Sequence, residues 1–182
     1  RFAFFSRAIL EMLFYTDFEP DIINCNDWQT ALIPIYLKDD GVREERLRGL
    51  KTVLSIHNIE YQGQYSFDIL QDVFDIAPEH APLLAYDGCI NLVKAAIQCA
   101  NRVTTVSPTY AQELKYAYFA HGLENVMSMN ARKLHGVLNG IDVKKRDSAA
   151  LNSKLIRRPV QRLYLVFLAP TFAAFCLGFL YP

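Results

Sequence analysis

The stretch Asp21-Ile22-Ile23-Asn24-Cys25 is apolar in its middle and is followed by the polar pair Asn26-Asp27. A short apolar run that ends in polar residues is typical of a buried parallel strand leading into a loop. Three later segments have the same form. They are residues 52–56 before His57-Asn58, residues 102–106 before Ser107-Pro108, and residues 135–139, which end at Asn139-Gly140.

Segments with helical spacing of apolar residues lie around these strands. Helices are expected at residues 2–13, 29–37, 89–100 and 123–132. Ser107 with Pro108 has the N-cap and first-turn chemistry of one more helix. Pro34 is a liability inside the second helix, and the charged residues 38–49 are predicted to form a loop. The alternation predicts an α/β fold with a mostly parallel, Rossmann-like sheet and helices on both faces.

The formal net charge of the 182 residues is zero, which favours neither a polyanion-binding protein nor an acidic disordered chain. The charges are divided unevenly, because residues 1–143 contain 18 acidic and 12 basic side chains, whereas residues 144–182 contain 1 acidic and 7 basic ones. Hydrophobic residues make up 52% of the chain, enough for the core of one domain. We therefore treat residues 1–143 as a domain and residues 144–182 as a basic and apolar tail.

The four cysteines are scattered and form no Cys-x-x-Cys pair. This spacing argues against a disulfide framework and against a structural zinc site, so a reducing compartment is expected. The chain begins at Arg1 inside an amphipathic pattern, with neither an initiator Met nor a signal peptide, and we interpret this start as a truncation.

Polar residues at the carboxyl ends of parallel strands are the first candidates for a ligand site, because open α/β sheets bind ligands there. Asp27 beside Trp28 could hold a sugar, but on the pattern alone a helix N-cap with a packed Trp is the better interpretation. His57 could exchange hydrogen bonds with a substrate, or be a satisfied structural residue. Asn139-Gly140 could equally be a turn in which Gly supplies a positive φ. The other histidines show no metal-ligand spacing.

Five blocks of this sequence resemble bacterial glycogen synthase and plant starch synthase. They are RFAFFSRAILEML (1–13), PDIINCNDWQTALIPIYLK (20–38), TVLSIHNIEYQGQY (52–65), YDGCINLVKAAIQCANRVTTVSPTYAQEL (86–114) and GVLNGID (136–142). The blocks are ordered and correctly spaced over about the first 143 residues. Their agreement makes the resemblance specific, where any one block would be weak evidence.

The resemblance implies a retaining glucosyltransferase built from two Rossmann domains, with residues 1–143 forming part of the N-terminal one. Such an enzyme moves glucose from ADP-glucose to the non-reducing end of an α-1,4-glucan, without a metal ion or other cofactor. The implied partners are ADP-glucose and a glucan acceptor, with no nucleic acid. The implied location is cytoplasmic, or the plastid stroma in a plant.

Roles for individual residues also follow from the resemblance. Asp27 is expected to contact sugar in the active-site cleft, His57 to stabilise charge at the reacting carbon, and Asn139 to hydrogen-bond a glucosyl hydroxyl. Further substrate contacts are expected from Trp28, Asn58, Tyr61, Gln62 and Gly140, with Tyr61 and Gln62 on the acceptor side. Asn26 departs from the family, which often has His there. An amide cannot titrate, so no proton-transfer role is expected at this position.

Other elements of the family do not occur in these 182 residues, namely a Lys-x-Gly-Gly-Leu loop and a second Rossmann domain with cations for the leaving diphosphate. Electrostatic stabilisation is usually among the largest catalytic effects, so this polypeptide alone is expected to be inactive or nearly so. One alternative is a non-catalytic glucan-binding or membrane-tethered module. Another is a sucrose synthase-like enzyme, although the Tyr61-Gln62-Gly63 loop and the NGID block fit the glucan synthases better.

The tail does not follow the family pattern after Asp142. Residues 163–181 are an uncharged run of 19 residues that follows a basic segment. A membrane anchor, a buried helix or hairpin broken at Pro170, or an out-of-frame or chimaeric reading of the gene would each explain the run. We favour the last, because the pattern ends inside a motif rather than at a domain boundary. Membrane contact is expected only through residues 163–181.

Overall fold

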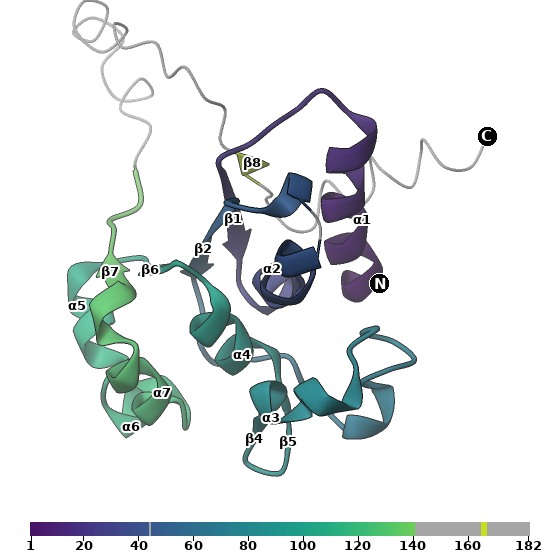
Figure 1. Cartoon of the computed structure of the whole chain (residues 1–182). Coiled ribbons are helices and arrows are strands. Elements are labelled where there is room, and N and C mark those ends of the chain that lie inside the picture. The colour runs from purple at the N-terminus through teal and green to yellow at the C-terminus, as the bar shows by residue number, and fades with distance from the viewer. Residues whose placement is uncertain (44, 141–164, 167–182) are drawn as a thin grey trace, which may run out of the picture.

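The computed structural model describes residues 1–43, 45–140 and 165–166. Its centre is a five-stranded parallel sheet with the strand order β7-β6-β2-β1-β8 (Figure 1). These strands are β1 Ile22–Asn26, β2 Lys51–Ile56, β6 Arg102–Thr105, β7 Leu134–Gly136 and β8 Leu165–Val166. A small antiparallel sheet has the order β3-β5-β4, with β3 Gln64–Tyr65, β4 Ala85–Tyr86 and β5 Cys89–Asn91.

The described α-helices lie beside the sheet and below it in the view of Figure 1. They are α1 Phe2–Tyr15, α2 Leu32–Arg43, α3 Ala81–Leu84, α4 Leu92–Cys99, α5 Pro108–Glu113, α6 Ala117–Ala120 and α7 Glu124–Met129. β1, β2, β6 and β7 succeed one another across the sheet, so right-handed connections bring α2, α4 and α5 to the same face. The other face borders the groove described below.

The predicted Rossmann-like parallel sheet is confirmed, and each of the four predicted strands is present. The last of them is shorter than expected, because β7 ends at Gly136 and not at Asn139. Its pairing partner β6 ends at Thr105, which pairs with Gly136. One more hydrogen bond, from Val137 N–H to the Thr105 carbonyl at 2.8 Å, closes the ladder. Asn139 therefore lies in a loop beyond the sheet.

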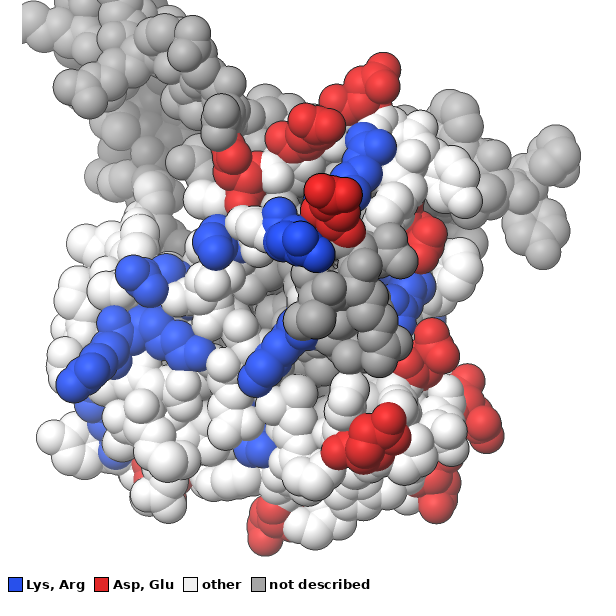
Figure 2. Space-filling view, viewed as in Figure 1, with Lys and Arg blue, Asp and Glu red and all other residues white. Residues whose placement is uncertain are grey.

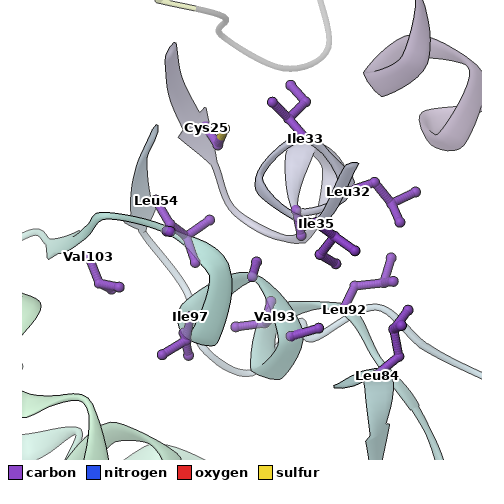
Figure 3. Packing of buried hydrophobic residues seen from close by; sticks show 14 of the residues in the cluster. Cys25, Leu32, Ile33, Ile35, Leu54, Leu84, Leu92, Val93, Ile97 and Val103 are labelled. Atoms are coloured by element: carbon purple, nitrogen blue, oxygen red, sulfur yellow. The ribbon is translucent and has the colours of Figure 1, made fainter. Parts of the chain in front are cut away.

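The core lies between the sheet and the helices α2 and α4 (Figure 3). Figure 3 shows Cys25, Leu54 and Val103, from three neighbouring strands, on the side of the sheet where α2 and α4 lie. All three are almost completely buried, and full burial of an aliphatic side chain contributes about 1.5 to 3 kcal/mol. Burial also raises the pKa of the Cys25 thiol, which therefore remains a neutral core residue.

The second predicted helix begins later and ends later than the sequence suggested. The residues after Asp27 first form a 3-10 turn, Trp28–Thr30, and α2 then runs from Leu32 to Arg43. Residues 38–43, expected in a loop, are thus helical. Pro34 is the third residue of α2, where its missing N–H does no harm because first-turn N–H groups have no partner within the helix.

The third predicted helix, over residues 89–100, also differs, because its first three residues form a strand. Cys89–Asn91 form β5, and α4 begins at Leu92. The side chain of Asn91 ends the strand and starts the helix by accepting a hydrogen bond from Lys94 N–H at 2.9 Å. Asn is among the preferred N-cap residues, and this cap overrides the apolar spacing that had placed Cys89 in the helix.

Charged side chains of both signs are spread over the face shown in Figure 2, among uncharged residues. No described helix is long and apolar enough to cross a membrane. The boundary expected after residue 143 lies outside the described residues, as does the apolar run 163–181 apart from Leu165–Val166, whose backbone pairs with β1.

Candidate functional site

The strand ends β1, β2 and β6 and the segment after β7 border one groove, with a volume of about 400 Å³. The groove continues along the sheet face opposite the core, because alternate strand residues point to opposite faces. Its lining residues are Ile22, Asn24, Asn26, Val53, Ser55, Ile56, His57, Thr104, Thr105, Val106, Val137 and Asn139. Three strand ends indicated by the sequence, at Asn26, His57 and Asn139, therefore meet in this groove.

Asp27 fixes the loop that follows β2. Its carboxylate Oδ1 accepts hydrogen bonds from the backbone N–H of His57 at 2.7 Å and of Asn58 at 3.3 Å. The φ of Asp27 is 53°, a left-handed conformation that costs a non-glycine residue roughly 1 to 3 kcal/mol. Asp27 does stand at the N-cap position of the turn Trp28–Thr30, but its side chain makes no capping hydrogen bond. The N-cap interpretation is therefore wrong for the carboxylate, which binds the neighbouring loop.

His57 is exposed at the groove, and its Nε2 lies 3.0 Å from Asn26 Oδ1. The next residue, Asn58, is exposed too, and its side chain accepts a hydrogen bond from Glu60 N–H at 3.0 Å. This local bond is an Asx turn, which shapes the loop after β2. The sequence placed His57 and Asp27 at the ends of separate strands. In the structure the Asp27 carboxylate binds the backbone N–H of His57.

A row of polar side chains crosses the floor of the groove, and sequence analysis did not identify it. Ser55 Oγ donates to Asn24 Oδ1 at 2.9 Å and lies 2.9 Å from Thr104 Oγ1. The three residues come from β1, β2 and β6, and we call them the polar row. Asn24 and Ser55 each lie between two apolar residues of their strands, so a strict test for alternation could have found these two.

The Asn139-Gly140 pair is exposed, and only Asn139 lines the groove. The φ of Gly140 is outside the left-handed region, so a turn that needs a positive φ at this glycine is not formed. The glycine with a steric role is Gly136, where a Cβ would overlap the backbone of Ser107 and Pro108. Close approach of β7 to the start of α5 thus depends on Gly136.

Trp28 is packed rather than open to the groove. Its ring lies edge-on to Phe2, with centroids 4.9 Å apart, and is tilted against Tyr65 at 6.4 Å. A Cβ at Gly63 would approach Trp28 to 3.1 Å. The packed-Trp interpretation is therefore confirmed.

The two residues expected on the acceptor side have opposite environments. Tyr61 is 61% exposed, whereas Gln62 is 6% exposed. Gln62 Nε2 donates to the His121 carbonyl at 3.0 Å, and its Oε1 accepts from Asn91 Nδ2 at 2.6 Å. Both ends of the Gln62 amide are thus used inside the protein, and Tyr61 is the side chain left available for a ligand.

The predicted helix start at Ser107 is confirmed, because Ser107 Oγ accepts a hydrogen bond from Tyr110 N–H at 2.9 Å and Pro108 is the first residue of α5. Tyr110 in turn lies under the loop after β2, where its hydroxyl is 3.5 Å from Ile59 N. No group of three or more His, Cys, Asp or Glu side chains in the described parts of the chain is arranged to hold a metal ion.

Comparison with known proteins identifies relatives of this chain. Residues 1–129 match the family model of the starch synthase catalytic domain. The chain is 44% identical to the glycogen synthase of Halalkalibacterium halodurans over 147 residues, which cover 81% of this chain and 30% of that protein. It is also 44% identical to the glycogen synthase of Alkaliphilus metalliredigens over 144 residues, covering 78% and 30%.

A solved structure agrees with these matches. The catalytic domain of starch synthase IV from Arabidopsis thaliana, bound to ADP and acarbose, superposes with a TM-score of 0.72 and 37% identity, covering 79% of this chain and 30% of that one. The chain thus spans about 30% of the length of the relatives it matches. With the parallel sheet and the matched family model, these likenesses show that the chain belongs to the glycogen and starch synthase family of glycosyltransferases.

Proposed function

We propose that the groove is part of the active site of a glycogen or starch synthase. This enzyme transfers glucose from ADP-glucose to the non-reducing end of an α-1,4-glucan with retention and without a metal ion. One observation carries the proposal: Asn26, His57 and Asn139 meet at one groove in a chain of this family. Amide and imidazole groups exchange hydrogen bonds with hydroxyls, which is the chemistry that sugar binding needs.

Within this proposal the residues divide into those that touch sugar and those that support them. His57 lies beside the transferred glucose, Asn139 binds a glucosyl hydroxyl, and Tyr61 contacts the acceptor. Asp27 acts on the same sugar through the loop that it holds, since its Oδ1 binds the backbone of His57. Trp28 and Gln62 support the loop from inside, because one is packed and the other is internally hydrogen-bonded.

A chimaera tests the catalytic part of the proposal. Residues 1–140 of this chain replace the matching segment of the Halalkalibacterium halodurans glycogen synthase, and transfer of glucose from ADP-glucose to maltooligosaccharide is measured. We expect transfer with retained anomeric configuration, and a loss of roughly 10²-fold or more in the His57→Ala variant. The matched control is His80→Ala, a histidine outside the groove, which should keep the rate. A folded chimaera without transfer would contradict the proposal.

The 182-residue chain by itself is proposed to be inactive or nearly so. Its sequence contains no counterpart of the family's cationic residues for the leaving diphosphate, whose stabilisation is a large part of catalysis. The measurement is glucose transfer by the purified chain against an Asp27→Ala control. Transfer above that control would overturn the proposal. A cytoplasmic location is likewise proposed, and cell fractionation tests it.

A further inference from the structure

Asn26, at the end of β1, is held firmly although its side chain faces the groove. The residue is 8% exposed. Its backbone N–H donates to Thr30 Oγ1 at 2.6 Å, and the same hydroxyl donates back to the Asn26 carbonyl at 2.9 Å. Thr30 itself is buried. The N–H and the carbonyl of Asn26 thus both bind one buried hydroxyl. These two hydrogen bonds fix the position of the Asn26 backbone, from which its side chain extends.

The amide oxygen of Asn26 lies 3.0 Å from Nε2 of His57. A carbonyl oxygen only accepts hydrogen bonds, so Nε2 carries the proton in this arrangement. In the neutral imidazole the other nitrogen, Nδ1, then has a free lone pair and acts as an acceptor. The contact therefore selects one of the two tautomers of His57.

A second contact fixes the same residue from the neighbouring position of the chain. Asp27 Oδ1 holds the backbone N–H of His57, while Asn26 Oδ1 holds its ring. The groove residues contributed by β6 and by the segments after β6 and β7 bear no titratable side chain, and among the described residues the charged group that forms a hydrogen bond with His57 is Asp27. Two consecutive residues thus set the position of the backbone and the ring of His57.

We propose that Asn26 is a positioning residue that fixes His57 as the Nε2–H tautomer and so presents Nδ1 as a hydrogen-bond acceptor to a sugar hydroxyl in the groove. The hydroxyl part of this statement rests on the proposed function, whereas the tautomer does not. An amide keeps its oxygen as an acceptor at every pH at which the protein folds, because it does not titrate. The tautomer is therefore set without a second ionisable group.

The experiment is nitrogen-15 NMR of the imidazole rings in the purified 182-residue chain, without sugar, at a pH where the His57 ring is neutral. We expect mainly Nε2–H in the unmodified chain. In Asn26→Ala the ratio of Nε2–H to Nδ1–H should fall about fivefold, the equivalent of one neutral hydrogen bond. Asn26→Asp retains an acceptor oxygen at the same distance and should keep the ratio at least as high.

Asn24→Ala is the matched control, because Asn24 lies two residues earlier on the same strand face but contacts Ser55. It should leave the His57 ratio unchanged. A ring that is mainly Nδ1–H in the unmodified chain would overturn the proposal even if Asn26→Ala failed to fold. An unchanged ratio in a folded Asn26→Ala would overturn it as well. Loss of glucose transfer in the chimaera, with the tautomer as expected, would count against the proposed function alone.

Discussion

The two faces of the parallel sheet are built differently from the same strands. The face toward α2 and α4 carries the buried residues Ile23, Cys25, Leu54, Ile56 and Val103. The face toward the groove carries the polar row, Asn24, Ser55 and Thr104. Alternation along each strand places successive side chains on opposite faces, so each residue of the polar row lies opposite the buried residues of its own strand.

Within each strand, the residues on the core face contribute mainly to stability, and those on the groove face are the ones available to a ligand. Removing a methyl group from the core leaves a cavity, because packed interiors relax only partly. A side chain at the edge of an open groove loses fewer contacts, and water can replace its hydrogen-bond partners. Substitutions on the two faces should therefore have different costs at neighbouring positions of one strand.

The largest effect is expected from Leu54→Ala, on the core face of β2. Leu54 is fully buried, and such truncations cost about 2 to 5 kcal/mol. Val53→Ala, next to it on the groove face and only partly buried, should cost less than half as much. The free energies of unfolding in urea measure both. Equal costs would mean that the two faces do not differ as described.

The second effect is expected from Gly136→Ala, where β7 meets α5. The new Cβ would overlap the backbone of Ser107 and Pro108, so the structure must shift at a cost of roughly 1 to 3 kcal/mol. Gly140→Ala is the control, because a Cβ there has open space. Urea unfolding of the two variants should differ clearly. A neutral Gly136→Ala would contradict this close approach.

A smaller effect is expected from Ser55→Ala, in the middle of the polar row. The change removes the hydroxyl that bonds to Asn24 and contacts Thr104. A net loss of about 0.5 to 1.5 kcal/mol is typical for one hydrogen bond. The measured cost should fall between those of Leu54→Ala and the control Ser128→Ala, at an exposed position of α7. A cost as large as that of Leu54→Ala would place the polar row in the core.

The smallest effect concerns Tyr110, beneath the loop after β2. Burial raises the pKa of its phenol, and the carboxylates of Asp27 and Glu113 add to this. A raised pKa in the folded state means that stability is complete below the unfolded value, about pH 10, and decreases as pH rises above it. Tyr110→Phe should therefore lose less stability than the unmodified chain between about pH 9 and pH 11. Urea midpoints at the two pH values decide this, and equal losses would contradict it.

Much of the fold was predictable because local patterns and tertiary packing agree. The strands at Ile22–Asn26 and Lys51–Ile56 match the apolar runs closely, and Ser107 caps α5 as its sequence context indicated. The differences arise where a side chain overrides a pattern. Asn91 caps α4, so the helix begins at Leu92 and not at Cys89, and the end of β6 at Thr105 limits β7. Neither the N-cap hydrogen bond of Asn91 nor the end of β6 is encoded in the apolar periodicity from which the helix and the last strand were predicted.

Some features of the candidate site were likewise predictable from the sequence, and others were not. Asn26, His57 and Asn139 were indicated because polar residues follow apolar strands, and the groove brings them together. The packing of Trp28 was the interpretation that the local pattern favoured, whereas the burial of Gln62 was not predictable, because its partner His121 is distant in sequence. Family resemblance names residues, but it does not show which side chains have already used their hydrogen-bonding groups.

The amino-acid sequence by itself determined the alternation of strands and helices and the polar strand ends, because these depend on periodicity and local order. The resemblance of five sequence blocks indicated the family. Only the tertiary structure decided what each polar group contacts. Asp27 holds the backbone of His57, and Asn26 holds its ring, across about 30 residues of chain. Such contacts exist only because parallel pairing sets β1 beside β2 and brings both strand ends to one edge.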